Sequence, residues 1–172
     1  STILNLAPLI SKIVNPDCII TDVGSTKQEI INKLEKIFPN YIGSHPLAGS
    51  EKRSIINARS DIFKDSLCIL TPTKNTNAKA LRKIKRLWSQ LGARVFILNP
   101  SNHDKILSFI SHLPHVAAFS LIQTIPQGYL KFASSGLKDI TRIALSDSKL
   151  WEDIFLSNQK NMLEAIELFQ KN

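Results

Sequence analysis

Up to about residue 99 the chain alternates short, continuously apolar stretches with longer amphipathic ones, and after that point the short stretches stop. The short stretches are typical of buried strands and cover residues 18–22, 41–43, 67–71 and 94–98. Between them, apolar residues recur at helical spacing over residues 3–14, 26–38 and 77–91. Strands that alternate with helices are typical of a parallel α/β sheet, so we expect a domain of this class over residues 1–99.

Residues 100–172 show no strand pattern and are predicted to form a separate, all-α unit. Residues 106–125 are apolar nearly all round, which favours a helix buried between other helices or at a subunit interface. We expect mixed helix and turn over residues 129–145, and the apolar spacing from Trp151 to Phe169 predicts one last long helix.

Composition excludes other classes of protein. No apolar run approaches the ~20 residues of a membrane span, so no membrane partner is expected. Cys18 and Cys68 form no CxxC pair, which excludes a zinc ribbon or a disulfide framework and favours a reducing, cytoplasmic setting.

The net charge of +8 and the basic residues concentrated between Lys74 and Arg86 could indicate that the chain binds nucleic acid. Leu81, Ile84, Trp88 and Leu91 are predicted to form the buried face of helix 77–91, which contains most of these basic residues. The charges are therefore expected on the solvated face, and no aromatic residue lies between them to stack on bases. We expect no nucleic-acid partner.

Two polar residues follow predicted strands, at the edge where open α/β sheets bind ligands. Ser25 has capping-box spacing to Gln28, so its hydroxyl is predicted to cap helix 26–38, to face the ligand crevice, or both. His45 is placed in a loop over residues 45–51, because the residue before a proline avoids helix. A histidine there suits proton transfer, although many loop histidines have no special role.

A polar stripe lies along the apolar helix after residue 100. Its members share helical steps of three and four: Asp104, Ser108, Ser111, His112 and His115. Pro114 removes one backbone hydrogen bond and is expected to kink the helix, freeing a carbonyl near the stripe, which makes this helix a candidate pocket wall. His112 and His115 lack the context of a metal site. Arg142 either pairs with a carboxylate of the protein or binds one from a ligand.

Five motifs occur in one order along the chain. They are Asp22-x-Gly24-Ser25-x-Lys27, Gly43-x-His45-Pro46-x-Ala48-Gly49-x-Glu51, Ser111-His112-Leu113-Pro114-His115, Leu137-Lys138-Asp139-x-Thr141-Arg142-Ile143-Ala144 and Leu150-Trp151-x-Asp153-Ile154. Together they resemble the prephenate/arogenate dehydrogenase family of tyrosine biosynthesis, over essentially the whole chain.

The resemblance implies the C-terminal part of a Rossmann-like domain over residues 1–99, followed by a helical substrate-binding and dimerisation domain over residues 100–172. It implies oxidative decarboxylation of prephenate or arogenate, with NAD or NADP taking the hydride. His45 matches the family's base for the substrate hydroxyl. Ser25 matches a serine near that hydroxyl and the nicotinamide, and Gly24 lies beside it on the cofactor side.

The resemblance also implies which residues bind the substrate's carboxylates. Arg142 matches the carboxylate-binding arginine, with His115 and Ser50 as further polar contacts, and Glu51 is expected to pair with a cation at the mouth of the pocket. The family pairs two subunits through its helical part, so a homodimer is expected.

Two departures from the family leave other functions open. The six glycines are not spaced as a dinucleotide-binding fingerprint, so the 172-residue chain is expected to bind NAD or NADP no better than roughly millimolar and to be inactive alone. Arg53 and Ser54 stand where the family has a small residue and a glycine. The alternatives are a non-catalytic dimeric remnant and a β-hydroxyacid-type dehydrogenase, for whose lysine Lys131 and Lys138 are the only candidates nearby.

Overall fold

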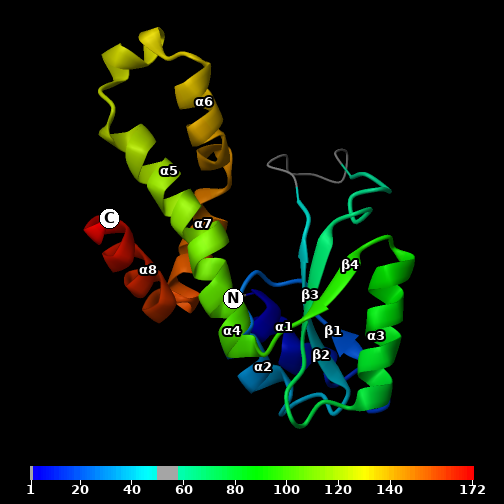
Figure 1. Ribbon diagram of the computed structural model, residues 1–172. Helices are drawn as coiled ribbons and strands as arrows, with labels where there is room; N and C mark the ends of the chain where they lie inside the picture. The colour runs from blue at the N-terminus through cyan, green and yellow to red at the C-terminus, as the bar shows by residue number, and fades with distance from the viewer. Residues whose placement is uncertain (1, 50–57) are drawn as a thin grey trace. The chain divides into compact units, whose positions relative to one another are not determined.

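The computed structural model describes residues 2–49 and 58–172. The chain divides into two compact units, residues 1–104 and residues 105–172. The first contains all of the described strands, and the second is helical (Figure 1). The division falls inside helix α4 (Pro100–Leu107), a few residues after the expected boundary at residue 99.

A four-stranded sheet forms the centre of the first unit. Its strands lie in the order β1 (Ile20–Thr21), β2 (Tyr41–Leu47), β3 (Leu67–Thr71) and β4 (Arg94–Ile97). The α/β architecture is confirmed, and the β1–β2 and β3–β4 pairs are parallel as expected. The β2–β3 pair is instead antiparallel. A parallel connection needs a crossover, usually a helix, and the described residues between β2 and β3 contain no helix.

Helices cover both faces of this sheet (Figure 1). α1 (Thr2–Ile10) and α2 (Gln28–Leu34) pack with Tyr41 on one face. α3 (Ala78–Gln90) packs with Ile42 on the other, since successive residues of a strand point to opposite faces.

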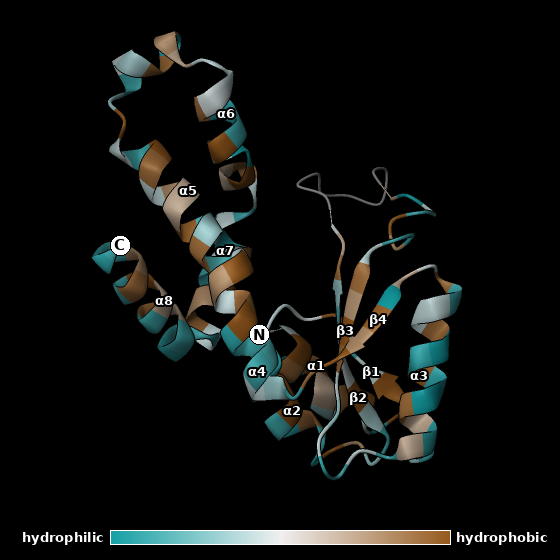
Figure 2. Cartoon of the chain, in the orientation of Figure 1, coloured by the Kyte–Doolittle hydropathy of each residue, from teal (hydrophilic) through white to brown (hydrophobic). Residues whose placement is uncertain are grey.

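Helix α3 follows its sequence pattern closely. The side-chain oxygen of Asn77 caps its start, and Gly92, with φ of 88°, ends it in the left-handed conformation that glycine tolerates. Ile84 and Trp88 are buried as predicted. The prediction that Leu91 belongs to the buried face is wrong, because Leu91 lies past the last turn of the helix and is exposed. Hydrophilic residues cover much of the rest of α3 (Figure 2), in agreement with a solvated basic face.

The prediction of a loop at His45 is wrong, because β2 continues to Leu47. His45 pairs with Ile69 of β3, and Pro46 pairs with Cys68. The extended conformation imposed before a proline suits a strand as well as a loop, and β3 supplies the partner that makes it a strand. His45 is therefore buried, with 8% of its surface exposed.

The second unit consists of short helices joined by turns. After α4 come a π-helical turn η2 (Ser108–His112), α5 (Leu113–Thr124), η3 (Gln127–Phe132), α6 (Ser135–Thr141), η4 (Arg142–Leu145), α7 (Ser148–Ser157) and α8 (Gln159–Lys171). The expected mix of helix and turn near residues 129–145 is confirmed. The prediction of one last long helix is wrong, because Asn158 separates α7 from α8.

A π-helical turn lies directly before α5, in which Pro114 is the second residue. There the Leu113 N–H bonds to the Ser108 carbonyl, five residues back. Helical residues Pro100–Thr124 are long and apolar enough to cross a membrane by length and composition alone, a feature that the sequence reading did not expect. Several of their apolar side chains are exposed within this chain, including Ile110 and Leu121. Such a surface is typical of an interface.

Candidate active site

A buried ion pair fixes the turn that follows β1. The ammonium of Lys27, which is 0% exposed, bonds to the Asp22 carboxylate and donates to the Ser44 carbonyl at 2.8 Å. Asp22 also accepts from the Gly24 N–H at 2.8 Å, the Tyr41 hydroxyl at 2.6 Å and the Ser44 N–H at 3.2 Å. These bonds hold the turn through Gly24 against strand β2.

Burial perturbs the ionisable groups of this cluster. Desolvation lowers the pKa of Lys27, and the neighbouring Asp22 carboxylate opposes that shift. Desolvation, reinforced by Asp22, raises the pKa of Tyr41, so its hydroxyl stays a hydrogen-bond donor. Burial likewise raises the pKa of Cys68 in β3 to about 12, which makes that thiol unreactive at neutral pH.

Gly24 and Ser25 lie beyond the C-terminal end of β1, as the sequence predicts. A Cβ atom at Gly24 would come within 2.8 Å of Ile30 and 2.9 Å of Asp22, so only glycine fits this turn without displacement. The capping-box prediction for Ser25 is wrong, because Lys27 occupies the N-cap position of α2. Ser25 is half-buried in the turn.

The cap of α2 comes from a distant residue. One oxygen of the Asp104 carboxylate accepts from the Lys27 N–H at 2.8 Å, and the other accepts from the Gln28 N–H at 2.9 Å. The sequence placed Asp104 in the polar stripe of the helical part, but its side chain belongs to the first unit. A carboxylate at this position satisfies two backbone donors and interacts favourably with the helix dipole.

A second histidine, His103, links the same carboxylate to His45 by hydrogen bonds. His103 Nδ1 lies 2.8 Å from Asp104 Oδ1, and His103 Nε2 lies 2.9 Å from His45 Nδ1. All three side chains are buried. The structure thus brings His45 and the turn at Ser25 into one hydrogen-bonded cluster, and a histidine held in this way can act as a general base.

His115 is placed in the helical unit. Its ring stacks on Trp151 with centroids 3.5 Å apart, and its Nδ1–H donates to the Ser111 carbonyl at 2.9 Å. Desolvation lowers the pKa of His115 below 6.5, with that hydrogen bond opposing, so the ring is neutral at pH 7. His112 is buried beside it, where its Nδ1 accepts from the Asn158 amide at 3.2 Å.

The remaining predicted residues divide into two groups. Arg142 begins η4, which packs on α5, so it lies on an element adjacent to that of His115, and its side chain is exposed. Ser50 and Glu51, like Arg53 and Ser54, lie outside the described residues.

Sequence reasoning missed His103 and gave no role to Asp22 or Lys27. Asp22 and Lys27 belong to the first motif quoted above, so their place in that motif was an available signal. His103 had a weaker signal, a His-Asp pair that follows Pro100, Ser101 and Asn102 near the start of a helix.

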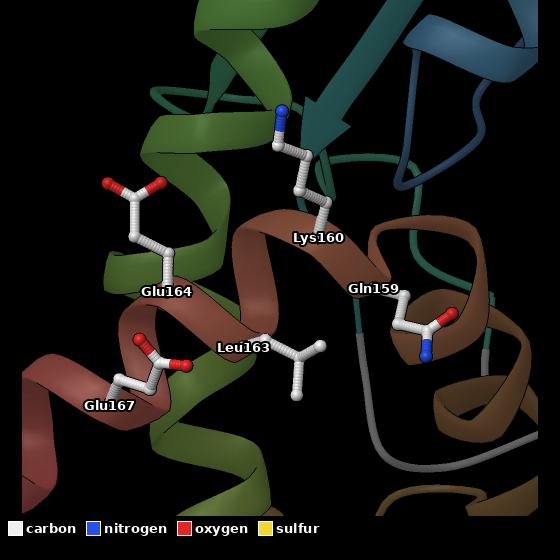
Figure 3. Close-up of a pocket in the computed structure, with 5 residues that line it drawn as sticks. All are labelled: Gln159, Lys160, Leu163, Glu164 and Glu167. Atoms are coloured by element: carbon white, nitrogen blue, oxygen red, sulfur yellow. The ribbon is translucent and has the colours of Figure 1, made fainter.

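The α8 surface and the potential metal ligands of the described residues add no further candidate for the active site. A pocket of about 410 Å³ in Figure 3 is lined by α8 residues alone: Gln159, Lys160, Leu163, Glu164 and Glu167. It contains none of the predicted site residues. Within residues 2–49 and 58–172, no group of three or more His, Cys, Asp or Glu side chains could hold a metal ion.

Comparisons with known proteins bear on both units. The family model described as prephenate dehydrogenase, nucleotide-binding domain, matches residues 1–97. The model described as prephenate dehydrogenase, dimerization domain, matches residues 99–172.

Individual relatives agree with the family models. The chain is 35% identical to prephenate dehydrogenase of Bacillus subtilis over 96% of this chain and 47% of the relative. It is 36% identical to cyclohexadienyl dehydrogenase of Zymomonas mobilis over 95% of this chain and 58% of the relative. The crystal structure of Aquifex aeolicus prephenate dehydrogenase with hydroxyphenyl propionate and NAD⁺ matches with a TM-score of 0.92 and 38% identity, over 99% of this chain and 62% of that one. The chain therefore spans about half the length of the curated relatives it matches.

Proposed function

This chain belongs to the prephenate dehydrogenase family, and we propose that its complete gene product catalyses the oxidative decarboxylation of prephenate, or of its amino counterpart arogenate. The observation that carries the proposal is the hydrogen-bonded series from Asp104 through His103 to His45, beside the turn at Ser25. The relatives named prephenate and cyclohexadienyl dehydrogenase support this substrate class.

The chemistry assigned to His45 is removal of the proton from the hydroxyl on ring carbon C4. As the oxygen–hydrogen bond breaks, the oxygen forms a carbonyl and hydride leaves C4. Loss of the ring carboxylate as CO₂ then restores aromaticity. Ser25 is assigned to the same hydroxyl as a hydrogen-bonding partner. General-base assistance of this kind contributes ~10²–10⁴-fold to a rate.

NAD or NADP is the hydride acceptor in this proposal, and the related Aquifex aeolicus structure contains NAD⁺. The turn at Gly24 and Ser25 fits the nicotinamide end, because it follows a strand at the edge where α/β sheets bind ligands and is tightly held. The six glycines lack the spacing of a phosphate-binding fingerprint, so this chain by itself is expected to bind either dinucleotide no better than roughly millimolar.

The helical part, residues 100–172, is proposed to bind the substrate's carboxylates and to form a homodimer. Arg142 is assigned to one carboxylate, because a guanidinium can bind it with two parallel hydrogen bonds and because the side chain is exposed. His115 and Ser50 are proposed as further polar contacts of the substrate, and Glu51 is proposed to pair with a cation.

The dimer proposal rests on an apolar groove of about 670 Å³ in the helical unit. Its lining comes from α5, α6, η4 and α8 and includes Leu121, Ile140 and Phe169, which are all exposed in the single chain. A second copy is the proposed cover, since the family model for this part is described as a dimerization domain. A cytoplasmic location is proposed because both cysteines are free.

The test uses the complete gene product with prephenate or arogenate and with NAD⁺ or NADP⁺, following reduced dinucleotide and CO₂ release. His45→Asn should lower kcat by ~10²-fold or more while KM changes little. Near-normal turnover by this variant would rule out the role of His45. Wild-type protein without turnover or dinucleotide binding would favour the non-catalytic remnant, and turnover of a β-hydroxyacid alone would favour the other dehydrogenase class.

A further inference from the structure

His103 and Asp104 form a buried pair behind His45, and the reaction proposed above assigns no role of its own to either residue. His103 is 0% exposed and Asp104 is 2% exposed. Both lie in the first turns of α4, whose start is fixed by Asn99: its side-chain oxygen accepts from the Asn102 N–H at 2.8 Å, and its carbonyl accepts from the His103 N–H at 3.0 Å. The pair is therefore held by a capped helix terminus.

Hydrogen-bonding chemistry assigns the protons along this series. An ionised carboxylate can only accept, so His103 Nδ1 must carry the hydrogen in its 2.8 Å bond to Asp104. A neutral His103 then has its lone pair on Nε2, and the 2.9 Å bond requires a hydrogen on His45 Nδ1. The remaining lone pair of His45 is on Nε2, the nitrogen that must take up the substrate proton.

The carboxylate that starts this series is itself immobilised. Asp104 accepts the Lys27 and Gln28 N–H groups at 2.8 and 2.9 Å while it accepts from His103. These two backbone donors fix the direction of the carboxylate oxygens. The orientation of His45 is thus coupled to the same turn that presents Gly24 and Ser25.

We propose that His103 and Asp104 are positioning residues that orient His45 and keep its Nε2 unprotonated before each turnover. The inference rests on the proposed function of His45 as the base. When the substrate O–H bond breaks, the proton forms a bond to His45 Nε2. His45 Nδ1–H keeps its bond to His103, and the Asp104 carboxylate stabilises the resulting imidazolium through the intervening ring.

The first test needs no catalysis. Long-range ¹H–¹⁵N NMR spectra of the 172-residue chain at pH 8 report which ring nitrogen of each histidine carries hydrogen. Hydrogen on Nδ1 and a lone pair on Nε2 are expected for both His45 and His103. Hydrogen on Nε2 of His45, or on both nitrogens of His103, would overturn the proposal.

The second test compares two substitutions in the complete gene product. His103→Phe removes both hydrogen bonds and should lower kcat by roughly 10-fold or more with little change in KM. His103→Gln offers an N–H₂ group to Asp104 and an oxygen to His45 in the same order as the imidazole, so it should restore most of kcat.

The two substitutions separate positioning from simple packing. Loss of kcat in His103→Phe with recovery in His103→Gln supports the proposal. Full activity of the phenylalanine variant contradicts it. A wild-type gene product without dehydrogenase activity would instead refute the proposed function, while the NMR spectra would still decide the protonation of His45.

Discussion

Replacing Lys27 with methionine should destabilise residues 1–104 by about 3–5 kcal/mol, the usual cost of breaking a buried ion pair by removing one partner. Methionine keeps much of the apolar stem, so the substitution tests the ammonium group. It leaves the Asp22 carboxylate buried without its counter-charge and removes the 2.8 Å bond to the Ser44 carbonyl.

The magnitude follows from the remaining contacts. Asp22 keeps three donors, from Gly24, Tyr41 and Ser44, which limit the loss. A carboxylate can also escape an unpaired buried charge by taking up a proton, which at pH 7 costs a carboxyl group of ordinary acidity about 4 kcal/mol. This sets an upper bound on the charge penalty, and the unmade bond at Ser44 adds about 1 kcal/mol.

Urea unfolding followed by fluorescence provides the assay. The first unit contains Trp88 and the second contains Trp151, so a Trp151→Phe background makes Trp88 the reporter of the first unit. The matched control is Lys33→Met in the same helix, whose partner Glu29 lies at 2.6 Å but whose pair is exposed, at 56% and 44%. An exposed pair contributes about 0–1 kcal/mol.

A loss no larger for Lys27→Met than for Lys33→Met would refute the reasoning. The double variant Lys27→Met with Asp22→Asn provides a second check, since it removes both charges of this buried pair. It should recover at least half of the lost stability, because much of the penalty belongs to the carboxylate left unpaired.

Three further predictions concern the helical unit. Arg142→Gln in the complete gene product should raise KM by roughly 10–150-fold, equivalent to ~1.5–3 kcal/mol, with unchanged thermal stability; loss of folded protein with normal kinetics would instead indicate a structural ion pair. Because the folded pKa of His115 is below its unfolded value of 6.5, the unfolded chain binds more protons, so stability should fall as pH drops below about 6.5; His115→Gln should lose less stability between pH 8 and pH 5, as measured by urea midpoints, and equal losses would contradict this. Light scattering at micromolar concentration should show a dimer that Ile140→Glu weakens and Leu156→Glu, equally exposed but outside the groove, does not; a monomeric wild type would refute the interface.

Local patterns determined much of the fold. Apolar spacing located the strands and the helices of the first unit to within a few residues, and α3, predicted over residues 77–91, spans Ala78–Gln90. Motif order identified the family and selected His45. These features depend on neighbouring residues, whose spacing is written directly in the chain.

Tertiary structure decided the environment of those residues. Ser25 has the spacing of a helix cap, yet Asp104 caps α2 from 77 positions away. His45 is read from sequence as a loop residue, yet pairing with β3 makes it part of a strand. His103 reaches His45 across 58 positions. A buried polar group must find a partner, but which partner lies within hydrogen-bonding distance depends on how strands and helices pack, and local spacing does not encode that distance.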